Sequence, residues 1–319
     1  MRPRVTNLRS RVVPGSPALS VVEVESTQLP RRVEVAAVEP DALALRLWGL
    51  RLNMDPYERP VCDGLIRRLW VRHAVPDGVE CRLALEFPAA LCAPRMETEA
   101  GIPACTRLLL SREPLRRTLG GRVVVVDPAH GGPDRGARGP INLEERHVVL
   151  KVAARLAHHL QEAGCRVHLT RQDDREVPPA RRVLTALASR AELFISLHTG
   201  HEPAPLCRGV RTLYGSTGAG SREQARDLAS RVHTALVEWL GLPDRGVAAA
   251  GPSDSPPGLL ASRWPLTYLA VEVVCLANPL DEALLRSSVF RDRLAQAIRN
   301  GLVRHHAHRA ARGEMALAV

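Results

Sequence analysis

The stretch VVVVDPAHGG, residues 123–132, joins a strongly apolar segment to the residues that end it. Four consecutive valines are typical of a strand that is buried on both faces of a sheet. The segment ends at Asp127-Pro128, and His130 then stands in front of two glycines. Because ligands of α/β proteins collect beyond the carboxyl ends of the strands, we expect His130 to face a functional site.

Downstream of this stretch, strand-like and helix-like segments alternate. The segment 143–164 has apolar residues at helical spacing and ends on Gly164, which predicts a helix with a C-terminal glycine. Strand-like segments are CRVHLT, ELFISL, GVRTLY and LAVEVV, with further helical patterns between and after them. This alternation predicts an α/β fold, a three-layer sandwich with a mostly parallel central sheet and helices on both faces.

The upstream part of the chain has a different pattern. From Arg31 to about Arg112, short β-like runs are separated by Pro, Gly and Asp, which predicts a small all-β domain. The expected order is an arm over residues 1–30, a small β-rich domain over 31–115, an α/β domain over 119–304 and a tail over 305–319.

Composition narrows the class of protein but not its function. The 319 residues are 45% hydrophobic and 24% charged, as in ordinary globular proteins. A net charge of +10 suits contact with nucleic acid, acidic lipid or a cell-wall polymer and cannot choose among them. Seven cysteines without a CxxC spacing imply neither a zinc ribbon nor a disulfide framework. We see no export signal and no apolar run of about 18 residues that would span a membrane.

Three residues have the chemistry of a metal site. His198 follows ELFISL as His130 follows VVVVDPA, so two histidines stand at equivalent strand ends. Glu145 has two interpretations: with Asn142 it resembles a capping box, or it points back at the strand end that carries His130. Two imidazoles and one carboxylate that leave an open coordination position form a hydrolytic zinc site.

Glu272 interrupts the apolar strand LAVEVV. Burial of an unpaired carboxylate is costly, so either an arginine pairs with Glu272 or its carboxylate faces the metal cleft with a raised pKa. We favour the second interpretation, because a hydrolytic metal site requires a general base and acid.

Taken in order, these segments resemble a known family. VVVVDPAHGGPDRGARG, EERHVVLKVAARLAHHLQEAGCRVHLTR, RAELFISLHT, RGVRTLY and VEVVCLANPLD are similar to the successive signatures of the zinc-dependent N-acetylmuramoyl-L-alanine amidases, the amidase_3 family, over about residues 121–304. The resemblance implies one Zn²⁺ held by His130, Glu145 and His198, with Glu272 as the catalytic acid and base. The implied reaction is hydrolysis of the amide between the lactyl group of N-acetylmuramic acid and L-alanine, with peptidoglycan and not nucleic acid as the partner.

Several other positions can be compared with the family pattern. Arg171 and Arg182 match family arginines that we expect to order the fold or its loops. Asp127 either orients His130 or forms the turn before it. Ala129 stands where the family usually has glycine, and Gly200 where it usually has Asn or Asp. We expect these two departures to affect substrate positioning and activity more than metal binding.

The β-rich part resembles the amidase N-terminal (AMIN) domain, which targets enzymes to the cell wall. Two alternatives to the amidase remain: a noncatalytic wall-binding or regulatory protein on the same fold, and a zinc carboxypeptidase-like enzyme. The substrate implies a location in the cell wall or the extracellular or periplasmic space. Without a visible signal peptide, the cytoplasm of a lysing mother cell is the other expectation.

Overall fold

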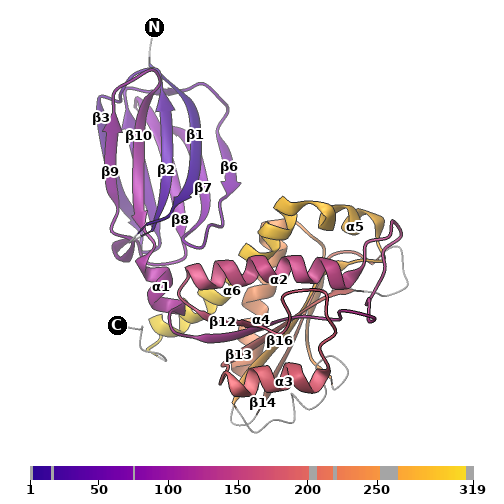
Figure 1. Cartoon of the computed structure of the whole chain (residues 1–319). Helices are drawn as coiled ribbons and strands as arrows, with labels where there is room; N and C mark the ends of the chain where they lie inside the picture. Colours follow the sequence, from indigo (N-terminus) through magenta and orange to yellow (C-terminus); the bar gives the residue numbers. More distant parts are fainter. Residues whose placement is uncertain are drawn as a thin grey trace. The chain divides into compact units, whose positions relative to one another are not determined.

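The computed structural model describes residues 3–15, 18–74, 76–200, 207–217, 221–251 and 265–313. These residues form two structural units, Met1–Thr118 and Leu119–Val319 (Figure 1). Each unit has its own sheets, so each is described by itself.

The first unit is a β-sandwich of two five-stranded sheets (Figure 1). The strand orders are β5-β1-β2-β10-β9 and β3-β4-β8-β7-β6, and every pairing is antiparallel except the short one between β1 and β5. Buried positions alternate with partly exposed ones along β10, as expected for a strand with one face in a core. The elements are β1 (Arg4–Val13), β2 (Leu19–Ser26), β3 (Arg32–Glu39), β4 (Ala42–Trp48), β5 (Arg51–Leu52), β6 (Tyr57–Pro60), β7 (Ile66–Ala74), β8 (Gly78–Leu85), β9 (Arg95–Glu99) and β10 (Ala104–Ser111), with a 3-10 turn at Ala89–Cys92 and helix α1 (Glu113–Leu119) after β10.

The arm expected over residues 1–30 differs from the structure, which has β1 and β2 there. β2 lies between β1 and β10, and Val22 and Val24 are buried in the core. The carboxylate of Glu23 lies 2.6 Å from Arg107 Nε on β10. This partner is remote in sequence, so the mixed polar and apolar pattern of the segment gave no local sign of a central strand.

The second unit contains a six-stranded sheet with the order β12-β11-β13-β16-β14-β15. All its pairings are parallel except the one between β14 and β16, so the sheet is mostly parallel, as expected. The strands β11, β13 and β16 are adjacent, and their carboxyl ends therefore meet at one edge. The strands are β11 (Val123–Pro128), β12 (Arg166–Leu169), β13 (Leu193–Gly200), β14 (Val210–Thr217), β15 (Asp244–Ala249) and β16 (Leu266–Cys275).

Helices cover both faces of this sheet (Figure 1). On one face α3 packs through Val183 and Ala186 on a core that contains Val125, Phe194 and Tyr268. On the other face α6 contacts both α2 and α4, and α2 contacts β11. The helices are α2 (Glu145–Glu162), α3 (Pro179–Ala188), α4 (Arg222–Leu240), α5 (Pro279–Arg286) and α6 (Ser288–Ala311). The predicted three-layer α/β fold is confirmed.

The tail expected over residues 305–319 is helical where it is described, because α6 continues to Ala311. His305 is buried, and its Nδ1 lies 2.8 Å from Asp227 Oδ2 on α4. The histidine-rich sequence resembles a solvated tail, but this contact with another helix keeps the segment packed. Residues 314–319 lie outside the described residues.

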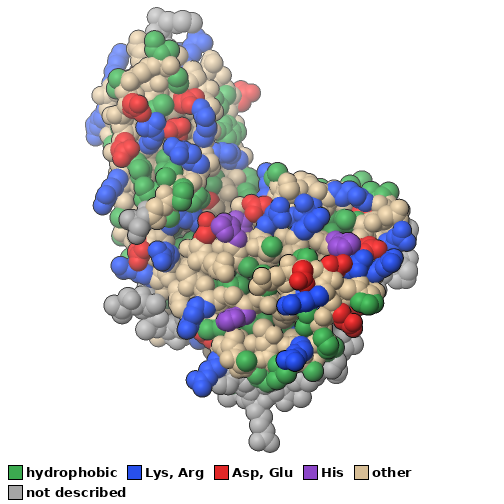
Figure 2. All heavy atoms as spheres, in the orientation of Figure 1, with side chains coloured by type: hydrophobic (Ala, Val, Ile, Leu, Met, Phe, Trp, Pro, Cys, Tyr) green, Lys and Arg blue, Asp and Glu red, His purple; other side chains and the backbone are tan. Residues whose placement is uncertain are grey.

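The surface of the described residues carries charges of both signs. Figure 2 shows basic side chains interspersed with acidic ones over the visible face. No described helix combines the length and the apolar character needed to cross a membrane.

Candidate metal centre

His130 lies just beyond the carboxyl end of β11, where the chain reverses in a left-handed backbone conformation. Its φ is +62°, followed by +129° at Gly131 and +62° at Gly132. The two glycines continue this conformation at little steric cost, which explains their position after the histidine. The reversal carries the imidazole toward the adjacent strand β13, on which His198 lies.

The structure brings His130, Glu145 and His198 together. One ligand atom from each residue lies within 4.8 Å of the others. His130 Nε2 is 3.2 Å from Glu145 Oε2, and His198 Nδ1 is 3.6 Å from Glu145 Oε1. Two nitrogens and one oxygen around one point are suitable ligands for Zn²⁺, and three protein ligands leave a coordination position open.

The second nitrogen of each imidazole has a partner of its own. His130 Nδ1 lies 2.9 Å from Asp134 Oδ2, and His198 Nε2 lies 2.9 Å from Ser196 Oγ. Such outer partners fix the tautomer and ring orientation of histidine ligands. The donor set and its outer partners therefore fit a divalent metal ion.

Glu145 is the first residue of α2, and its carboxylate is buried among polar partners. It accepts hydrogen bonds at 2.8 Å from the backbone N–H groups of Ala137 and Thr199. Burial raises the pKa of this carboxyl, but His130 and His198 together lower it by a larger amount. The pKa therefore lies well below its usual range. The capping-box interpretation of Glu145 is wrong, because the N-cap residue is Glu144 and has no side-chain capping hydrogen bond.

The electrostatics of the cluster favour a cation. Burial lowers the pKa of His130, whereas Glu145 and Asp134 raise it by more, to about 9. The two carboxylates thus stabilise positive charge at the position of the imidazole, as they would stabilise a bound metal ion.

Because Gly136 has no side chain, it leaves room for the cluster of His130 and Glu145. A Cβ atom at residue 136 would lie 2.5 Å from His130 Cδ2 and 2.7 Å from Glu145 Oε2. Any larger residue would therefore displace two of the three candidate ligands.

Two buried arginines hold the backbone that carries His130. Arg171 is fully buried and donates hydrogen bonds to the carbonyl oxygens of Pro128 at 2.9 Å and Ala129 at 2.7 Å. Arg182 donates to the carbonyl oxygens of Pro128 at 3.0 Å and His130 at 2.8 Å. Both arginines therefore order the loop of the first histidine, which is the structural role expected for them.

Among the described residues, the hydrogen bonds of Asp127 go to side chains other than the His130 ring. Its buried carboxylate accepts hydrogen bonds from Arg182 and from Ser196 Oγ, the latter at 3.2 Å, and Ser196 in turn contacts His198. Asp127 is linked to the loop of His130 through Arg182, which also donates a hydrogen bond to the carbonyl oxygen of His130. Sequence reasoning also missed Ser196 and Asp134, although Ser196 lies two residues before a histidine on the same face of a strand.

Glu272 lies on β16 directly opposite His198 on β13. Paired residues of adjacent parallel strands point to the same face, so Glu272 lies beside the candidate metal centre. Its Oε2 is 2.9 Å from Arg245 Nη1, and its Oε1 is 3.8 Å from Arg211 Nη1. The structure therefore gives Glu272 an arginine partner and also places its carboxylate beside the candidate metal centre, so the two alternatives are not exclusive.

The fold and the site define a class of protein: an α/β protein with a candidate metal centre at the carboxyl edge of its mostly parallel sheet. The Amidase_3 family model, described as N-acetylmuramoyl-L-alanine amidase, matches residues 124–304. Because this match covers more than half of the chain, the chain belongs to the Amidase_3 family.

Individual relatives agree with this assignment. The chain is 30% identical over 217 residues to the N-acetylmuramoyl-L-alanine amidase AmiC of Neisseria meningitidis, covering 57% of this chain and 52% of that protein. It is 29% identical over 211 residues to a germination-specific amidase of Bacillus subtilis, covering 61% of this chain and 84% of that protein. The match covers 52% of the length of AmiC and 37% of the length of LytC of B. subtilis. The chain therefore spans about half or less of these two relatives.

The fold also matches a solved structure. The structure of the amidase AmiC2 of Nostoc punctiforme aligns with a TM-score of 0.50 at 28% identity, over 57% of this chain and 96% of that chain. The shared region therefore corresponds in extent to the α/β unit.

Proposed function

We propose that this chain hydrolyses peptidoglycan by cleaving the amide bond between N-acetylmuramic acid and the L-alanine of the stem peptide, with one zinc ion as cofactor. The observation that carries the proposal is the cluster of His130, Glu145 and His198, whose ligand atoms lie within 4.8 Å of one another, with Glu272 on the adjacent strand. Membership of the Amidase_3 family supports the substrate.

His130, Glu145 and His198 would hold the zinc ion. When bound, zinc lowers the pKa of a water ligand to about 7 and polarises a carbonyl group. Asp134 and Ser196 keep the two imidazoles oriented, because each contacts the ring nitrogen on the far side of the cluster.

Glu272 would carry the proton. Its carboxylate accepts a proton from the attacking water and delivers it to the alanine nitrogen as the amide bond breaks. Arg245 and Arg211 lie beside this carboxylate, with Nη1 atoms at 2.9 Å and 3.8 Å from its oxygens.

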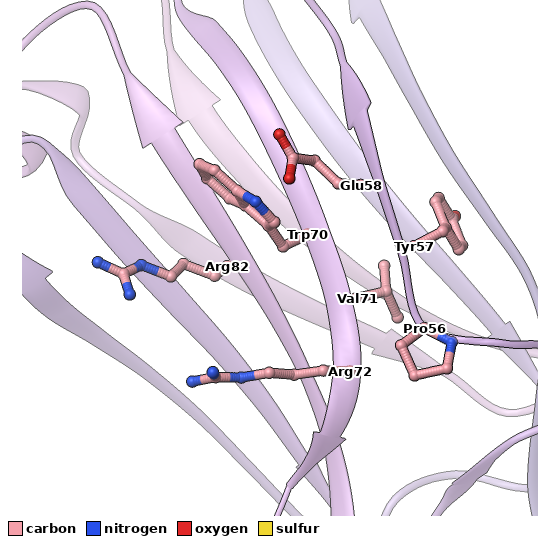
Figure 3. Close-up of a pocket in the computed structure, with 7 residues that line it drawn as sticks. All are labelled: Pro56, Tyr57, Glu58, Trp70, Val71, Arg72 and Arg82. Carbon is pink, nitrogen blue, oxygen red and sulfur yellow. The ribbon is translucent and has the colours of Figure 1, made fainter.

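The first unit offers a surface on which the wall polymer could bind. A cavity of about 600 Å³ is lined by Pro56, Tyr57, Glu58, Trp70, Val71, Arg72 and Arg82 (Figure 3). Trp70 lies opposite Glu58 on one neighbouring strand and Arg82 on the other. A tryptophan between charged side chains suits a polymer with both apolar and polar faces. We infer that this unit acts like an AMIN domain and retains the enzyme on the wall, and hence that the protein works in the cell wall or periplasm.

The test of the activity uses purified protein and cell-wall sacculi. We expect release of L-alanine amino termini with intact glycan chains, loss of release with a chelator and recovery with zinc. Glu272→Ala should abolish release while zinc still binds. Binding to sacculi without release by the native protein would instead support a noncatalytic wall-binding protein, and cleavage of peptide bonds within the stem would support a carboxypeptidase-like enzyme.

The role of the first unit needs a separate assay. Trp70→Ala in the full chain should reduce sedimentation with sacculi and leave cleavage of a soluble muropeptide unchanged. Arg32→Ala is the matched control, because Arg32 is exposed on the same sheet and does not line the cavity. Equal retention of Trp70→Ala and the native protein would contradict the proposed role.

A further inference from the structure

Arg245 lies at an irregular position in β15, and from there its side chain reaches Glu272. Between the pairs Val210↔Asp244 and Thr212↔Val247, β15 advances by one residue more than β14. The extra residue makes a β-bulge that contains Arg245 and Gly246, and Gly246 has a φ of +85°. Bulges change the direction of a side chain and occur often beside active sites. This bulge contains Arg245, whose Nη1 lies 2.9 Å from Glu272 Oε2.

The bulge is anchored by a chain of hydrogen bonds. Asp244 Oδ1 accepts the N–H of Gly246 at 2.6 Å and lies 2.7 Å from His233 Nε2 on α4. The other ring nitrogen of the buried His233 lies 3.2 Å from Thr212 Oγ1 on β14. The backbone on both sides of Arg245 is therefore fixed to a helix and to a neighbouring strand.

The guanidinium of Arg245 occupies the space where a side chain at residue 200 would begin. A Cβ atom built on Gly200 would lie 2.5 Å from Arg245 Nη1 and 3.4 Å from Glu272 Oε2. The first distance is too short for a real contact, whereas the second is an ordinary one. Gly200 is the position at which the family pattern has Asn or Asp. The space that a side chain at residue 200 would occupy is thus filled by the guanidinium of Arg245 from β15.

We propose that Arg245 is a positioning residue for Glu272, and that Gly200 is required because it leaves room for the guanidinium. This inference rests on the proposed function, in which Glu272 transfers the proton. Arg245 holds one carboxylate oxygen on the side of Gly200, and the carboxylate thereby keeps a fixed direction relative to the metal ligand His198. Arg245 is mostly buried, with a side-chain exposure of 12%, so little solvent competes for this ion pair.

The first test compares Arg245→Ala with Arg245→Lys in the zinc-loaded full chain. We expect Arg245→Ala to lower kcat by about 10- to 100-fold with little change in KM, as loss of a group that orients a reacting side chain does. Arg245→Lys should restore part of kcat, because the ammonium keeps the positive charge. Zinc content should equal that of the native protein.

Arg304→Ala is the matched control. Arg304 also makes an ion pair at 2.8 Å, with Glu238, and its side chain is 16% exposed. If the effect of Arg245→Ala were only loss of a half-buried ion pair, both variants would lower the melting temperature and neither would change kcat. A raised KM with unchanged kcat in Arg245→Ala would also overturn the proposal, because it would make Arg245 a substrate-binding residue.

The second test uses Gly200→Ala in two backgrounds. In the native chain the new methyl group should displace the guanidinium and lower kcat to about the level of Arg245→Ala. In the Arg245→Ala chain the same substitution should have almost no further effect, because the displaced group is gone. Independent, multiplicative losses would overturn the inference. If Glu272→Ala retains activity, the proposed function itself fails; if Glu272→Ala is inactive and Arg245→Ala has native kcat, only this inference fails.

Discussion

Arg182 joins the loop of the candidate metal centre to the central sheet, with its Nη2 donating a hydrogen bond at 2.8 Å to the carbonyl oxygen of His130. The same guanidinium forms a buried ion pair with Asp127 at the end of β11. The left-handed backbone at His130 is thus stabilised by a side chain from α3, on which no candidate ligand lies. This dependence leads to the first prediction.

Arg182→Gln should lower the free energy of unfolding of the second unit by about 3–5 kcal/mol, because it leaves the buried Asp127 carboxylate without its counterion. The double variant Arg182→Gln, Asp127→Asn should recover part of this loss, since no buried charge then remains unpaired. Thermal unfolding by calorimetry on the three proteins measures both effects. Equal stability of the single and the double variant would contradict the explanation.

Asp134→Ala should weaken zinc binding by about 10- to 100-fold, because Asp134 orients the ring of His130 through Nδ1. Competition with a chromogenic chelator measures the affinity. Asp292→Ala is the matched control, since Asp292 makes a similar contact of 2.8 Å with His159 away from the candidate ligands. A native affinity in Asp134→Ala would show that this outer partner is dispensable.

Gly136→Ala should reduce zinc binding more than its backbone strain can explain. The φ of Gly136 is +63°, and a Cβ there would collide with His130 and Glu145. Gly241 has a φ of +62°, but a Cβ there would meet nothing within 4 Å. Both alanine variants should therefore lose about 1 kcal/mol of stability from the left-handed conformation. Only Gly136→Ala should also lose zinc affinity in the same chelator competition.

The stability of the second unit should fall as the pH decreases from 7 to 5. Burial, together with the nearby charges of Arg122, His305 and Arg309, lowers the pKa of His306 to about 2. In the unfolded chain a histidine has a pKa of about 6.5, so below that pH the unfolded state binds more protons. The contribution of neutral His306 to the free energy of unfolding is thus fully present above about pH 6.5. It decreases as the pH falls toward the folded-state pKa.

The measurement is urea unfolding of metal-free protein at pH 7 and pH 5, for the native chain and His306→Leu. Removing this one titration should make the loss of stability between the two pH values smaller by about 2 kcal/mol. An identical loss in both proteins would assign the pH dependence to other groups. His305 and His159, whose pKa values are also lowered chiefly by burial, would then be the next candidates.

Much of the α/β unit could be predicted from local sequence patterns. The four valines before Asp127 form the buried strand β11, and the periodic segment after Glu145 forms α2. The positions of His130 and His198 at strand ends implied that their side chains would meet, because adjacent parallel strands end at one edge. The assignment of residues 1–30 to an arm was wrong because β2 is stabilised by β10, a strand remote in sequence.

The environment of Glu272 could not be predicted in the same way. The sequence LAVEVV indicated one acidic residue in a buried strand and left two alternatives, an arginine partner or a carboxylate that faces the metal cleft. The presence of the arginine partner depended on a bulge in β15 and on the absence of a side chain at residue 200. Neither feature has a local signature that identifies its partner.

The sequence by itself determined which segments are strands and helices in the α/β unit and which residues stand at the ends of the strands, because backbone sterics and side-chain periodicity act over a few residues. Only the tertiary structure decided which polar groups share each buried space. The partners of His130, His198 and Glu272 come from other strands, helices and loops, and a buried charge or hydrogen-bonding group is stable only where packing brings such a partner within reach.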